Sequence, residues 1–455
     1  MKKSSTLKNN LVPAILIKNI SIVNEGLITV ADVFMNNGRI EKIAPQINKE
    51  ASLEIDGTGK YLMPGIIDDQ VHFREPGLTH KASIYTESRA AVAGGVTSFM
   101  EMPNTVPNAL TQELLEDKYR IASRSSLANY SFFMGVSNDN YDEVMRTPVE
   151  EVCGIKIFMG SSTGNMLVDD VHVLERIFGN TPKIIATHCE SETIVKRNME
   201  KALSQYGENM QANMHPVIRD EEACFASSSY AVDLAKKCGT RLHVLHISTE
   251  EEIALFDNIL PLEQKKITAE VCVHHLHFSG DDYAVLGNKI KCNPAIKDAR
   301  HKPKLFEALL QNKFDVIATD HAPHTLDEKN QIYMKAPAGL PLVQHSLQLM
   351  LTFYFNNQIT LERIVEKMCH APAILFGVKD RGYIREGYYA DAFILDLNAT
   401  QTVATDNLFY KCAWSPLEGK TFRGRVTDTF VNGNIVYVNG QFDESSNGMR
   451  LKFTR

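Results

Sequence analysis

Short apolar runs rich in β-branched residues alternate with helix-like stretches through the middle of the chain. The runs lie at 65–72, 96–102, 130–136, 154–159, 183–189, 241–247, 266–273 and 315–320. Stretches in which apolar positions follow helical spacing separate some of them, at 111–125, 221–239 and 301–312. Strands that alternate with helices indicate a parallel sheet, and eight of them predict a closed α/β barrel, the (β/α)₈ or TIM-like barrel. A doubly wound open sheet would give the same local pattern and remains an alternative at this point.

The two ends of the chain follow a different pattern, in which β-branched residues alternate with polar ones as they do in short strands. Within residues 14–60, the turn signals Asn36-Asn37-Gly38 and Asp56-Gly57 separate such segments, and Asn432-Gly433 marks a hairpin near the other end. Neither end carries enough apolar residues for a stable sheet of its own. We therefore expect residues 1–60 and 379–455 to pair into one small composite β-sandwich domain beside a barrel of residues 61–378.

The composition is that of a soluble globular protein and excludes several classes of partner. Of the 455 residues, 44% are hydrophobic and 23% are charged, and the net charge of −7 offers no basic field for nucleic acid or an acidic membrane surface. The eight cysteines are scattered without a C-x-x-C pair, which is typical of reduced thiols. The apolar run at 11–17 is too short to span a membrane and lacks a small-residue cleavage site. We expect a cytoplasmic protein with a small-molecule substrate.

Ionisable or amide side chains stand at or near the C-terminal end of seven of the eight predicted strands. In a barrel these ends converge on one rim, and buried polar groups there are costly unless they are satisfied. Gln70, His72 and Arg74 are two positions apart, so they share one face of the first strand. Three later strands close with histidine or aspartate (His188, His246 and Asp320). Imidazoles and a carboxylate together are the expected ligands of a divalent metal used in hydrolysis.

Each of these residues also has a structural interpretation. A single histidine at a strand end is more often a hydrogen-bonded structural residue than a ligand, and Lys156 could extend to solvent or pair with an acid. Asp320 could belong to a loop turn. It is the coincidence of several such residues on one rim that favours a site. Other histidines are interpreted as structural or supporting (His243, His274, His275 and His277).

Several motifs make the interpretation more specific. They are "GIIDDQVHFREPG" (65–77), "EMPNT" (101–105), "THCE" (187–190), "LHIST" (245–249), "IATDHAPHT" (317–325) and "GYIREGYYADAFILD" (382–396). Together they resemble the dihydroorotase branch of the amidohydrolase superfamily over nearly the whole chain. The resemblance implies reversible hydrolysis and cyclisation between L-dihydroorotate and N-carbamoyl-L-aspartate, a step of de novo pyrimidine (UMP) biosynthesis.

The resemblance also implies the roles of individual residues. It places one or two zinc ions on His72, Lys156, His188, His246 and Asp320. Lys156 matches the position where many relatives carry an N6-carboxylated lysine, whose carbamate supplies the two anionic oxygens that bridge two metals. Substrate contacts fall on Arg74, Asn104, Asn293 and His324, and residues 336–341 resemble a loop whose backbone contacts the pyrimidine ring. In the implied mechanism a metal-activated hydroxide attacks the ring carbonyl, and Asp320 is the general base and then the general acid.

One position departs from the family pattern. Relatives usually carry histidine where this chain has Gln70, and a carboxamide oxygen is a weaker zinc ligand than an imidazole nitrogen. Gln70 then either ligates one metal through its oxygen, leaves one metal position weak or vacant, or marks an inactive member of the family. The presence of Arg74, Asn104, Asp320 and His324 argues against an inactive member.

Two other functions stay open. An allantoinase, or a dihydropyrimidinase (hydantoinase), would keep the metal ligands but has less use for Arg74 paired with Asn104. A non-catalytic scaffold would instead associate with a partner such as aspartate carbamoyltransferase. A homodimer is the expected oligomer, because twofold dimers are the commonest assemblies of such enzymes.

Overall fold

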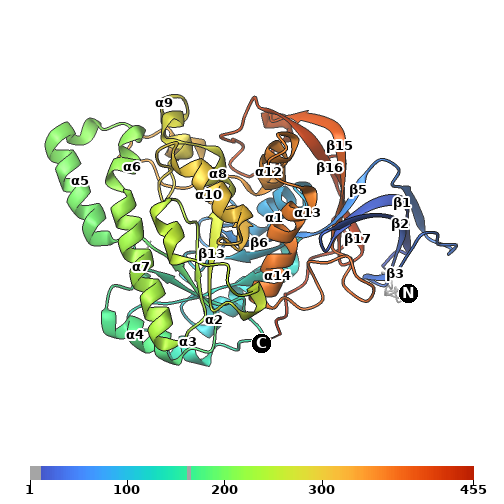
Figure 1. The fold of residues 1–455 in the computed structure, drawn as a ribbon, viewed down its shortest axis with the longest axis horizontal. Helices are drawn as coiled ribbons and strands as arrows, with labels where there is room; N and C mark the ends of the chain where they lie inside the picture. Colours follow the sequence, from blue (N-terminus) through green and yellow to red (C-terminus); the bar gives the residue numbers. More distant parts are fainter. Residues whose placement is uncertain (1–11, 161–164, 455) are drawn as a thin grey trace, which may run out of the picture.

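Parallel strands close into a barrel at the centre of the computed structural model, which describes residues 12–160 and 165–454 (Figure 1). The barrel strands are β6 (Ile66–Val71), β7 (Val96–Glu101), β8 (Asn129–Phe132) with β9 (Met134–Gly135), β10 (Ile155–Phe158), β11 (Ile185–His188), β12 (Leu242–Val244), β13 (Ile267–Cys272) and β14 (Val316–Ala318). Each falls within or beside a predicted run. The ring closes where Val71 bridges His321 in parallel and the N–H of His72 donates to the His321 carbonyl at 2.7 Å. This closure confirms the barrel and excludes the open sheet.

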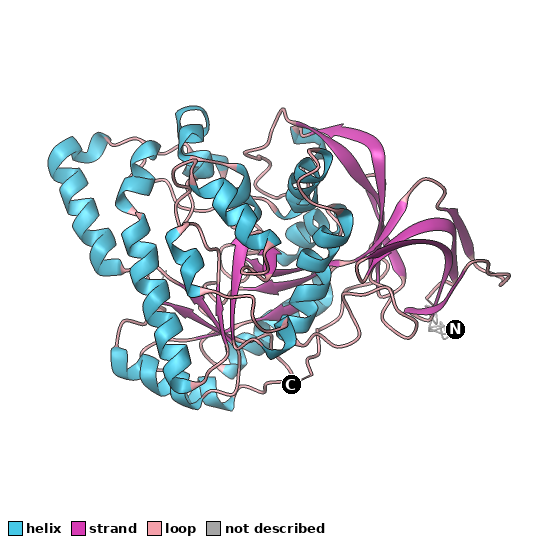
Figure 2. Ribbon diagram, viewed as in Figure 1, coloured by secondary structure: helices cyan, strands magenta, loops and turns pink. Residues whose placement is uncertain are grey.

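Helices surround the barrel strands and form the outer layer (Figure 2). The longer ones are α1 (Ile84–Ala93), α2 (Gln112–Ser125), α4 (Val171–Asn180), α5 (Glu192–Tyr206), α7 (Glu221–Cys238), α10 (His301–Leu310) and α12 (Ser346–Phe355). The shorter ones are α3 (Tyr141–Arg146), α6 (His215–Ile218), α8 (Val273–His277), α9 (Tyr283–Leu286), α11 (Leu326–Lys329), α13 (Leu361–Val365) and α14 (Ala371–Phe376). The three predicted helical stretches correspond to α2, α7 and α10. The side chain of Asp220 accepts from the Ala223 N–H to begin α7, and Gly239 ends it in the left-handed region at φ 68°.

Both ends of the chain build one mixed sheet beside the barrel, as expected. Its strands are β1 (Ile15–Asn24), β2 (Leu27–Asn36), β3 (Arg39–Ala44), β4 (Leu53–Asp56), β5 (Tyr61–Pro64), β15 (Ala392–Thr402), β16 (Thr421–Val431), β17 (Asn434–Val438) and β18 (Gln441–Phe442). The two ends meet where β5 pairs with β15 in antiparallel register. Ile15 of β1, Ile40 of β3, Ile394 of β15 and Phe430 of β16 share one buried cluster, so the strands enclose a common core.

The limits of this sheet differ slightly from the predicted boundaries. It extends past residue 60 to Pro64, and the chain enters the barrel at Gly65, where a Cβ would lie only 1.9 Å from Thr97 Oγ1. The last described residues return to the barrel, since the Leu451 N–H donates to the Tyr130 carbonyl at 2.9 Å. Residues 1–11 of the predicted N-terminal part lie outside the described residues.

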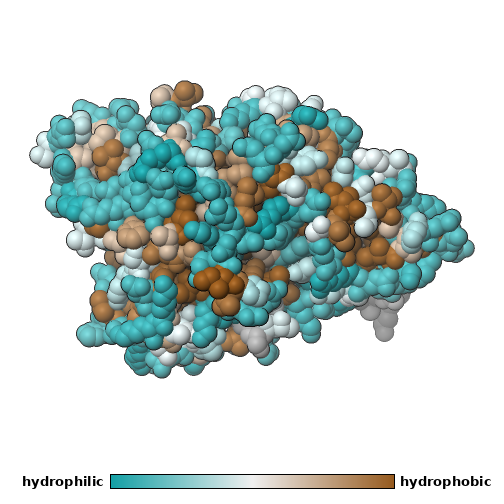
Figure 3. Space-filling view, viewed as in Figure 1, coloured by the Kyte–Doolittle hydropathy of each residue, from teal (hydrophilic) through white to brown (hydrophobic). Residues whose placement is uncertain are grey.

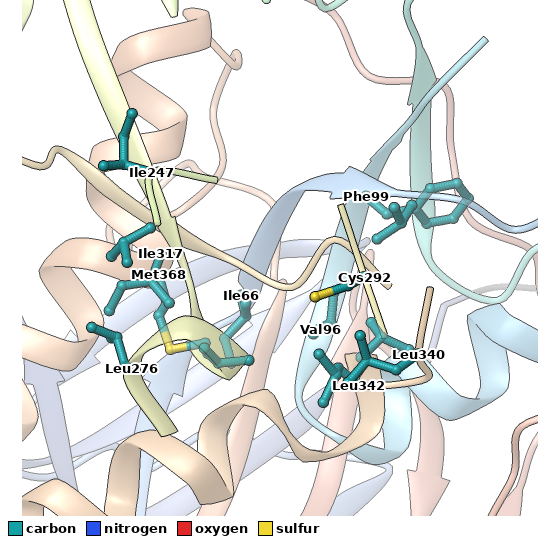
Figure 4. Close-up of a cluster of buried hydrophobic side chains, with 14 of the residues drawn as sticks. Ile66, Val96, Phe99, Ile247, Leu276, Cys292, Ile317, Leu340, Leu342 and Met368 are labelled. Atoms are coloured by element: carbon teal, nitrogen blue, oxygen red, sulfur yellow. The ribbon is translucent and has the colours of Figure 1, made fainter. Parts of the chain in front are cut away.

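Apolar side chains from strands, helices and loops fill the interior around the barrel. Ile66 of β6, Leu276 of α8 and Ile317 of β14 belong to one buried cluster, together with Met368 (Figure 4). Hydrophilic residues cover most of the face seen in Figure 3, where apolar patches are scattered among them. Among the described residues, no helix is both long and apolar enough to cross a membrane.

A buried ion pair joins α2 to the end of β7, directly behind the chain that carries His72. Lys118 Nζ lies 2.9 Å from Glu101 Oε2, with 1% and 0% of the two side chains exposed. Glu101 also accepts from the Phe73 N–H at 2.9 Å, and Lys118 donates to the Met102 carbonyl at 2.9 Å. The pair therefore connects a helix to the first segment of the rim.

Lys118→Met is expected to lower the free energy of unfolding by about 3–5 kcal/mol, because it leaves the Glu101 carboxylate buried without its cation. Urea unfolding followed by tryptophan and peptide spectroscopy measures this loss. The matched control is the double variant Glu101→Gln, Lys118→Met, which removes both charges and should recover part of the lost stability. A single variant as stable as the parent protein would contradict the expectation.

His345, at the start of α12, provides a buried pH-sensitive element, and its partner Tyr410 packs against His321. The Tyr410 hydroxyl lies 3.0 Å from its Nδ1 and also accepts from the Gln344 N–H at 3.0 Å. The hydroxyl proton is then directed at a neutral imidazole nitrogen. Burial lowers the pKa of His345 to about 3, so the folded protein keeps this ring neutral in mild acid.

His345→Gln is expected to make stability less dependent on pH in mild acid. The folded pKa lies below the unfolded value of about 6.5, so the unfolded chain takes up a proton first as the pH falls. The stability from the neutral ring is present above about pH 6.5 and is lost toward about pH 3, at about 1.4 kcal/mol per pH unit. Urea unfolding across this range should show a slope that is shallower by this amount in the variant. His172→Gln, which changes an exposed histidine, should leave the slope unchanged.

Candidate active site

The predicted metal ligands gather at the carboxyl end of the barrel. His72 follows β6, His188 is the last residue of β11, and Asp320 lies two residues after β14. Lys156 stands deeper, within β10. Arg74, His246 and Asp320 have positive φ angles of 68°, 41° and 48°. Such conformations cost of order 1–3 kcal/mol each in non-glycine residues and cluster at functional sites.

His188 and His246 form one contacting pair. His188 Nδ1 lies 3.0 Å from His246 Nε2, and His188 Nε2 lies 2.9 Å from Glu190 Oε2. Glu190 also accepts from Arg219 at 2.5 Å. Burial opposes ionisation of Glu190, but the charge of Arg219 and the His188 hydrogen bond lower its pKa to about 2. A carboxylate behind a histidine fixes the tautomer and orientation of the ring, as it does for ligands in metalloenzymes.

His72 and Asp320 form the second pair. His72 Nε2 lies 3.1 Å from Asp320 Oδ1, and its Nδ1 lies 2.8 Å from Asn104 Oδ1. The Gln70 side-chain N–H donates to the same Asp320 oxygen at 3.1 Å. Burial opposes ionisation of Asp320, but the hydrogen bond from His72 and the charge of Lys156 hold its pKa below the ordinary value. Gln70 therefore presents its nitrogen to Asp320, and this nitrogen cannot ligate a metal.

Lys156 is buried with 1% of its surface exposed. Its Nζ lies 4.6 Å from the centre of the Phe158 ring, and none of the carboxylates among the described residues lies within ion-pair distance. Burial lowers the pKa of Lys156 to about 8, although the charge of Asp320 limits the shift. Part of the population therefore carries a neutral amine near neutral pH, and the neutral amine is the form that reacts with carbon dioxide.

Arg74 and His324, two of the predicted substrate contacts, lie together. Arg74 Nη2 is 3.0 Å from His324 Nε2, and Arg74 Nε donates to the Pro323 carbonyl at 3.0 Å. Lys81 donates to His324 Nδ1 at 3.0 Å, so the ring proton lies on Nε2 and is donated to the Ala338 carbonyl at 2.9 Å. The ring thus offers no lone pair to Arg74. Burial lowers the pKa of Arg74 only to about 10, which leaves the guanidinium charged.

The other two predicted substrate contacts have different neighbours. Asn104 contacts His72 and so belongs to the ligand pair rather than to Arg74. Asn293 Oδ1 lies 3.0 Å from Nε2 of His215, a residue that the motifs did not indicate. The predicted substrate loop at 336–341 lies against the site, because a Cβ on Gly339 would lie 3.0 Å from His324 Nε2.

Sequence reasoning missed a second buried cluster below the rim. His243 Nε2 lies 3.2 Å from Asp69 Oδ2 and 3.7 Å from Glu270 Oε2, and all three side chains are fully buried. Burial alone would lower the pKa of His243, but the two carboxylates raise it to about 9. Asp69 lies on the face of β6 opposite to Gln70. Because adjacent side chains of a strand point to opposite faces, the sequence could have indicated that Asp69 points away from the face that carries Gln70 and His72. His243 carries a compensating charge, which is consistent with the structural role predicted for it.

The donor atoms on the rim fit a divalent cation, although they form separate pairs. No group of three described His, Cys, Asp or Glu donors within 4.8 Å includes any of His72, His188, His246 or Asp320. When the Nδ1–H of His72 donates to Asn104, the lone pair of His72 Nε2 faces an Asp320 oxygen at 3.1 Å. Two acceptors that face each other repel, and a cation bound between them would remove this repulsion. Nδ1 of His246 is buried without a hydrogen-bond partner in the described structure.

Comparison with known proteins places the chain in a family. Residues 61–436 match the model of the amidohydrolase family, and the chain therefore belongs to it. The fold of a TIM-like barrel with a composite β domain agrees with this assignment. The chain is a hydrolase of the cyclic amidohydrolase kind.

Individual relatives differ in name but cover nearly the whole chain. A dihydroorotase of Methanosphaera stadtmanae is 30% identical over 93% of this chain and 96% of its own length. An allantoinase of Deinococcus radiodurans is 32% identical over 93% of this chain and 95% of its own length. An L-hydantoinase (dihydropyrimidinase) from Arthrobacter aurescens has a similar structure, with a TM-score of 0.89, 27% identity, and coverage of 96% of this chain and 99% of that one.

Proposed function

We propose that this chain is a zinc-dependent dihydroorotase, which interconverts L-dihydroorotate and N-carbamoyl-L-aspartate. The observation that carries the proposal is a buried arginine without an acidic partner. Arg74 is 8% exposed, and no carboxylate of the described residues lies within ion-pair distance of it, although the charges of Asp320 and Glu101 act on it from further away. A buried guanidinium that no carboxylate contacts directly is suited to an anionic ligand, and its planar fork matches a carboxylate.

The substrates of the competing functions differ in the feature that Arg74 would recognise. Dihydroorotate carries a carboxylate on its ring, whereas allantoin and dihydrouracil do not. His324 is held neutral by the neighbouring charges of Arg74 and Lys81, after the larger effect of burial, and this lowers its pKa well below the ordinary value. It therefore adds no second charge, and Arg74 supports selection of a ring with one carboxylate.

The positions of the remaining residues are consistent with the roles that we propose for them. His72, His188, His246 and Asp320 would hold the zinc ions, and Lys156 would join them as a carbamate. Bound zinc would polarise the ring carbonyl and make water a better nucleophile near neutral pH. In the hydrolytic direction water adds to the carbonyl carbon and the ring C–N bond breaks. Asp320, held anionic by its neighbours, would accept the proton of the attacking water and deliver it to the leaving nitrogen.

Parallel assays with dihydroorotate, allantoin and dihydrouracil test the proposal. Protein purified without chelators and supplied with zinc and bicarbonate should hydrolyse dihydroorotate with a kcat/KM at least about 100-fold above that for either neutral ring, given about 1.5–3 kcal/mol for each hydrogen bond to a charged group. Turnover of allantoin or dihydrouracil without turnover of dihydroorotate would overturn it. The absence of activity on all three rings would favour the scaffold function.

A further inference from the structure

Three donor residues outside the predicted ligand set lie together at the end of β13. Cys272 is the last residue of β13, and His274 and His275 follow it in α8 (Figure 1). One donor atom from each lies within 4.8 Å of the other two. The exposed fractions are 0%, 0% and 3%. A thiol and two imidazoles at this separation are the donor types that zinc prefers.

Three ring nitrogens of this cluster are buried without a well-aligned hydrogen bond among the described residues, which is costly for polar atoms. Neither Nδ1 nor Nε2 of buried His274 makes a well-aligned hydrogen bond in the described structure, and a weak contact with the Thr319 backbone satisfies at most one of them. Nε2 of His275 lies 3.2 Å from the Pro294 carbonyl, to which it can only donate, so the lone pair is on Nδ1. That Nδ1 is also without a partner. Leaving such groups unsatisfied costs about 1–3 kcal/mol each, which ligation would offset.

Gln70 approaches the cluster with its oxygen. Because its side-chain nitrogen donates to Asp320, Oε1 is directed to the other side, where it lies 3.9 Å from Cys272 Sγ. With metal–donor bonds of about 2.0–2.3 Å, two ligands of a tetrahedral ion lie about 3.3–3.8 Å apart. The oxygen and the sulfur are therefore close to the separation that a shared ion requires.

We propose that Cys272, His274 and His275 bind a zinc ion, with Gln70 Oε1 as the fourth donor. This centre uses none of the residues of the pairs His188–His246 and His72–Asp320, but it lies beside them, because Gln70 contacts Asp320 and the charges of His274 and His275 act on His246. The thiol donates to Glu270 Oε1 at 3.2 Å, and its proton leaves for solvent when the sulfur binds the metal as a thiolate. Gln70, the residue that departs from the family pattern, would thereby bind metal through its side-chain oxygen.

The backbone around the cluster is firmly held, which favours a built site. Leu276, the residue after His275, lies in the large buried cluster with Ile317 and Met368 (Figure 4). On the other side β13 pairs with β14 through Cys272 and Ala318. Packing thus holds the donors from both directions. Because the donor atoms of Cys272, His274 and His275 lie within 4.8 Å of one another, each pair needs to approach by at most about 1.5 Å to reach the spacing of a tetrahedral ion.

Cobalt substitution of the full-length protein tests the site, because a thiolate bound to Co²⁺ gives an intense near-ultraviolet charge-transfer band that nitrogen and oxygen ligands do not give. The protein loaded with Co²⁺ should show this band, and Cys272→Ser should lose it together with about one equivalent of bound metal. The matched control is Cys369→Ser, which changes another buried thiol, one that donates to the Pro64 carbonyl at 3.3 Å, and it should keep the band. His188→Ala should also keep it, since that residue belongs to the other pair.

Two outcomes overturn the site. One is a cobalt-loaded parent protein without the band, and the other is a band that survives Cys272→Ser. If that variant does not fold, X-ray absorption of the zinc-loaded parent protein decides, because a sulfur scatterer at about 2.3 Å supports the site and a shell of nitrogen and oxygen alone refutes it. Dihydroorotate hydrolysis measured on the same samples keeps the two proposals apart, since an active enzyme without zinc–sulfur ligation refutes this site and retains the proposed function.

Discussion

Asp320→Asn should reduce kcat for dihydroorotate by about 10²–10⁴-fold, the usual contribution of a positioned acid–base group, while the protein remains folded. Asparagine has nearly the same volume and tolerates the left-handed backbone at φ 48° better than most residues. It can still accept from Gln70, but it can neither take a proton from water nor return one to the ring nitrogen. The loss should therefore appear in kcat rather than in stability.

Asp315→Asn is the matched control for this experiment. Asp315 is a buried aspartate at the opposite end of the same strand, where it pairs with Lys265 at 2.8 Å. Residues at that end of a barrel strand support stability, whereas those at the carboxyl end support catalysis. Asp315→Asn should thus lower the unfolding midpoint and leave kcat near the parent value. A normal kcat in Asp320→Asn would remove the acid–base role, provided that the metal content of the two variants is equal.

Arg74→Lys should raise the KM for dihydroorotate by about 10–100-fold, since it removes one or two hydrogen bonds of about 1.5–3 kcal/mol to a charged group. Lysine keeps the positive charge but loses the planar fork, and its single ammonium cannot hold the Pro323 carbonyl and a substrate carboxylate in the same geometry. Because Arg74 also orients the ring, we expect a smaller decrease in kcat. Steady-state kinetics of the purified variant measure both effects.

A neutral ring provides the internal control for Arg74→Lys. Any residual hydrolysis of dihydrouracil should change little, because that ring has no carboxylate for Arg74 to contact. Equal losses on the two rings would show that Arg74 supports the site as a whole rather than the carboxylate. An unchanged KM for dihydroorotate would contradict the proposed contact.

The positions of the apolar runs were sufficient to locate the barrel strands, because a strand buried on both faces is mostly apolar. They also located the rim, since His188, His246 and Asp320 stand where those runs end. The pairing of atoms on the rim could not be predicted in the same way. Which nitrogen of His188 faces Glu190, and which end of the Gln70 amide faces Asp320, depends on neighbours that are distant in sequence.

The histidines of α8 show a second limit of the sequence pattern. His274 and His275 were interpreted as structural or supporting residues, and adjacent side chains of a strand would in any case point apart. The chain turns into a short helix after Cys272, and this turn brings donors from successive positions together. The substrate contacts illustrate the same limit, because Asn293 was assigned by resemblance and its neighbour His215 lies in a segment without a recognisable motif.

The sheet shared by the two ends of the chain has a consequence for synthesis on the ribosome. Strand β5 emerges early, but its partner β15 lies more than 300 positions later. At about 5–20 residues per second, the hydrogen-bonding edge of β5 stays open for tens of seconds while the whole barrel is made. An open edge readily pairs with other chains. The newly made N-terminal strands are therefore the segment for which we expect the greatest dependence on chaperones, and shortening this delay should raise the yield of folded protein.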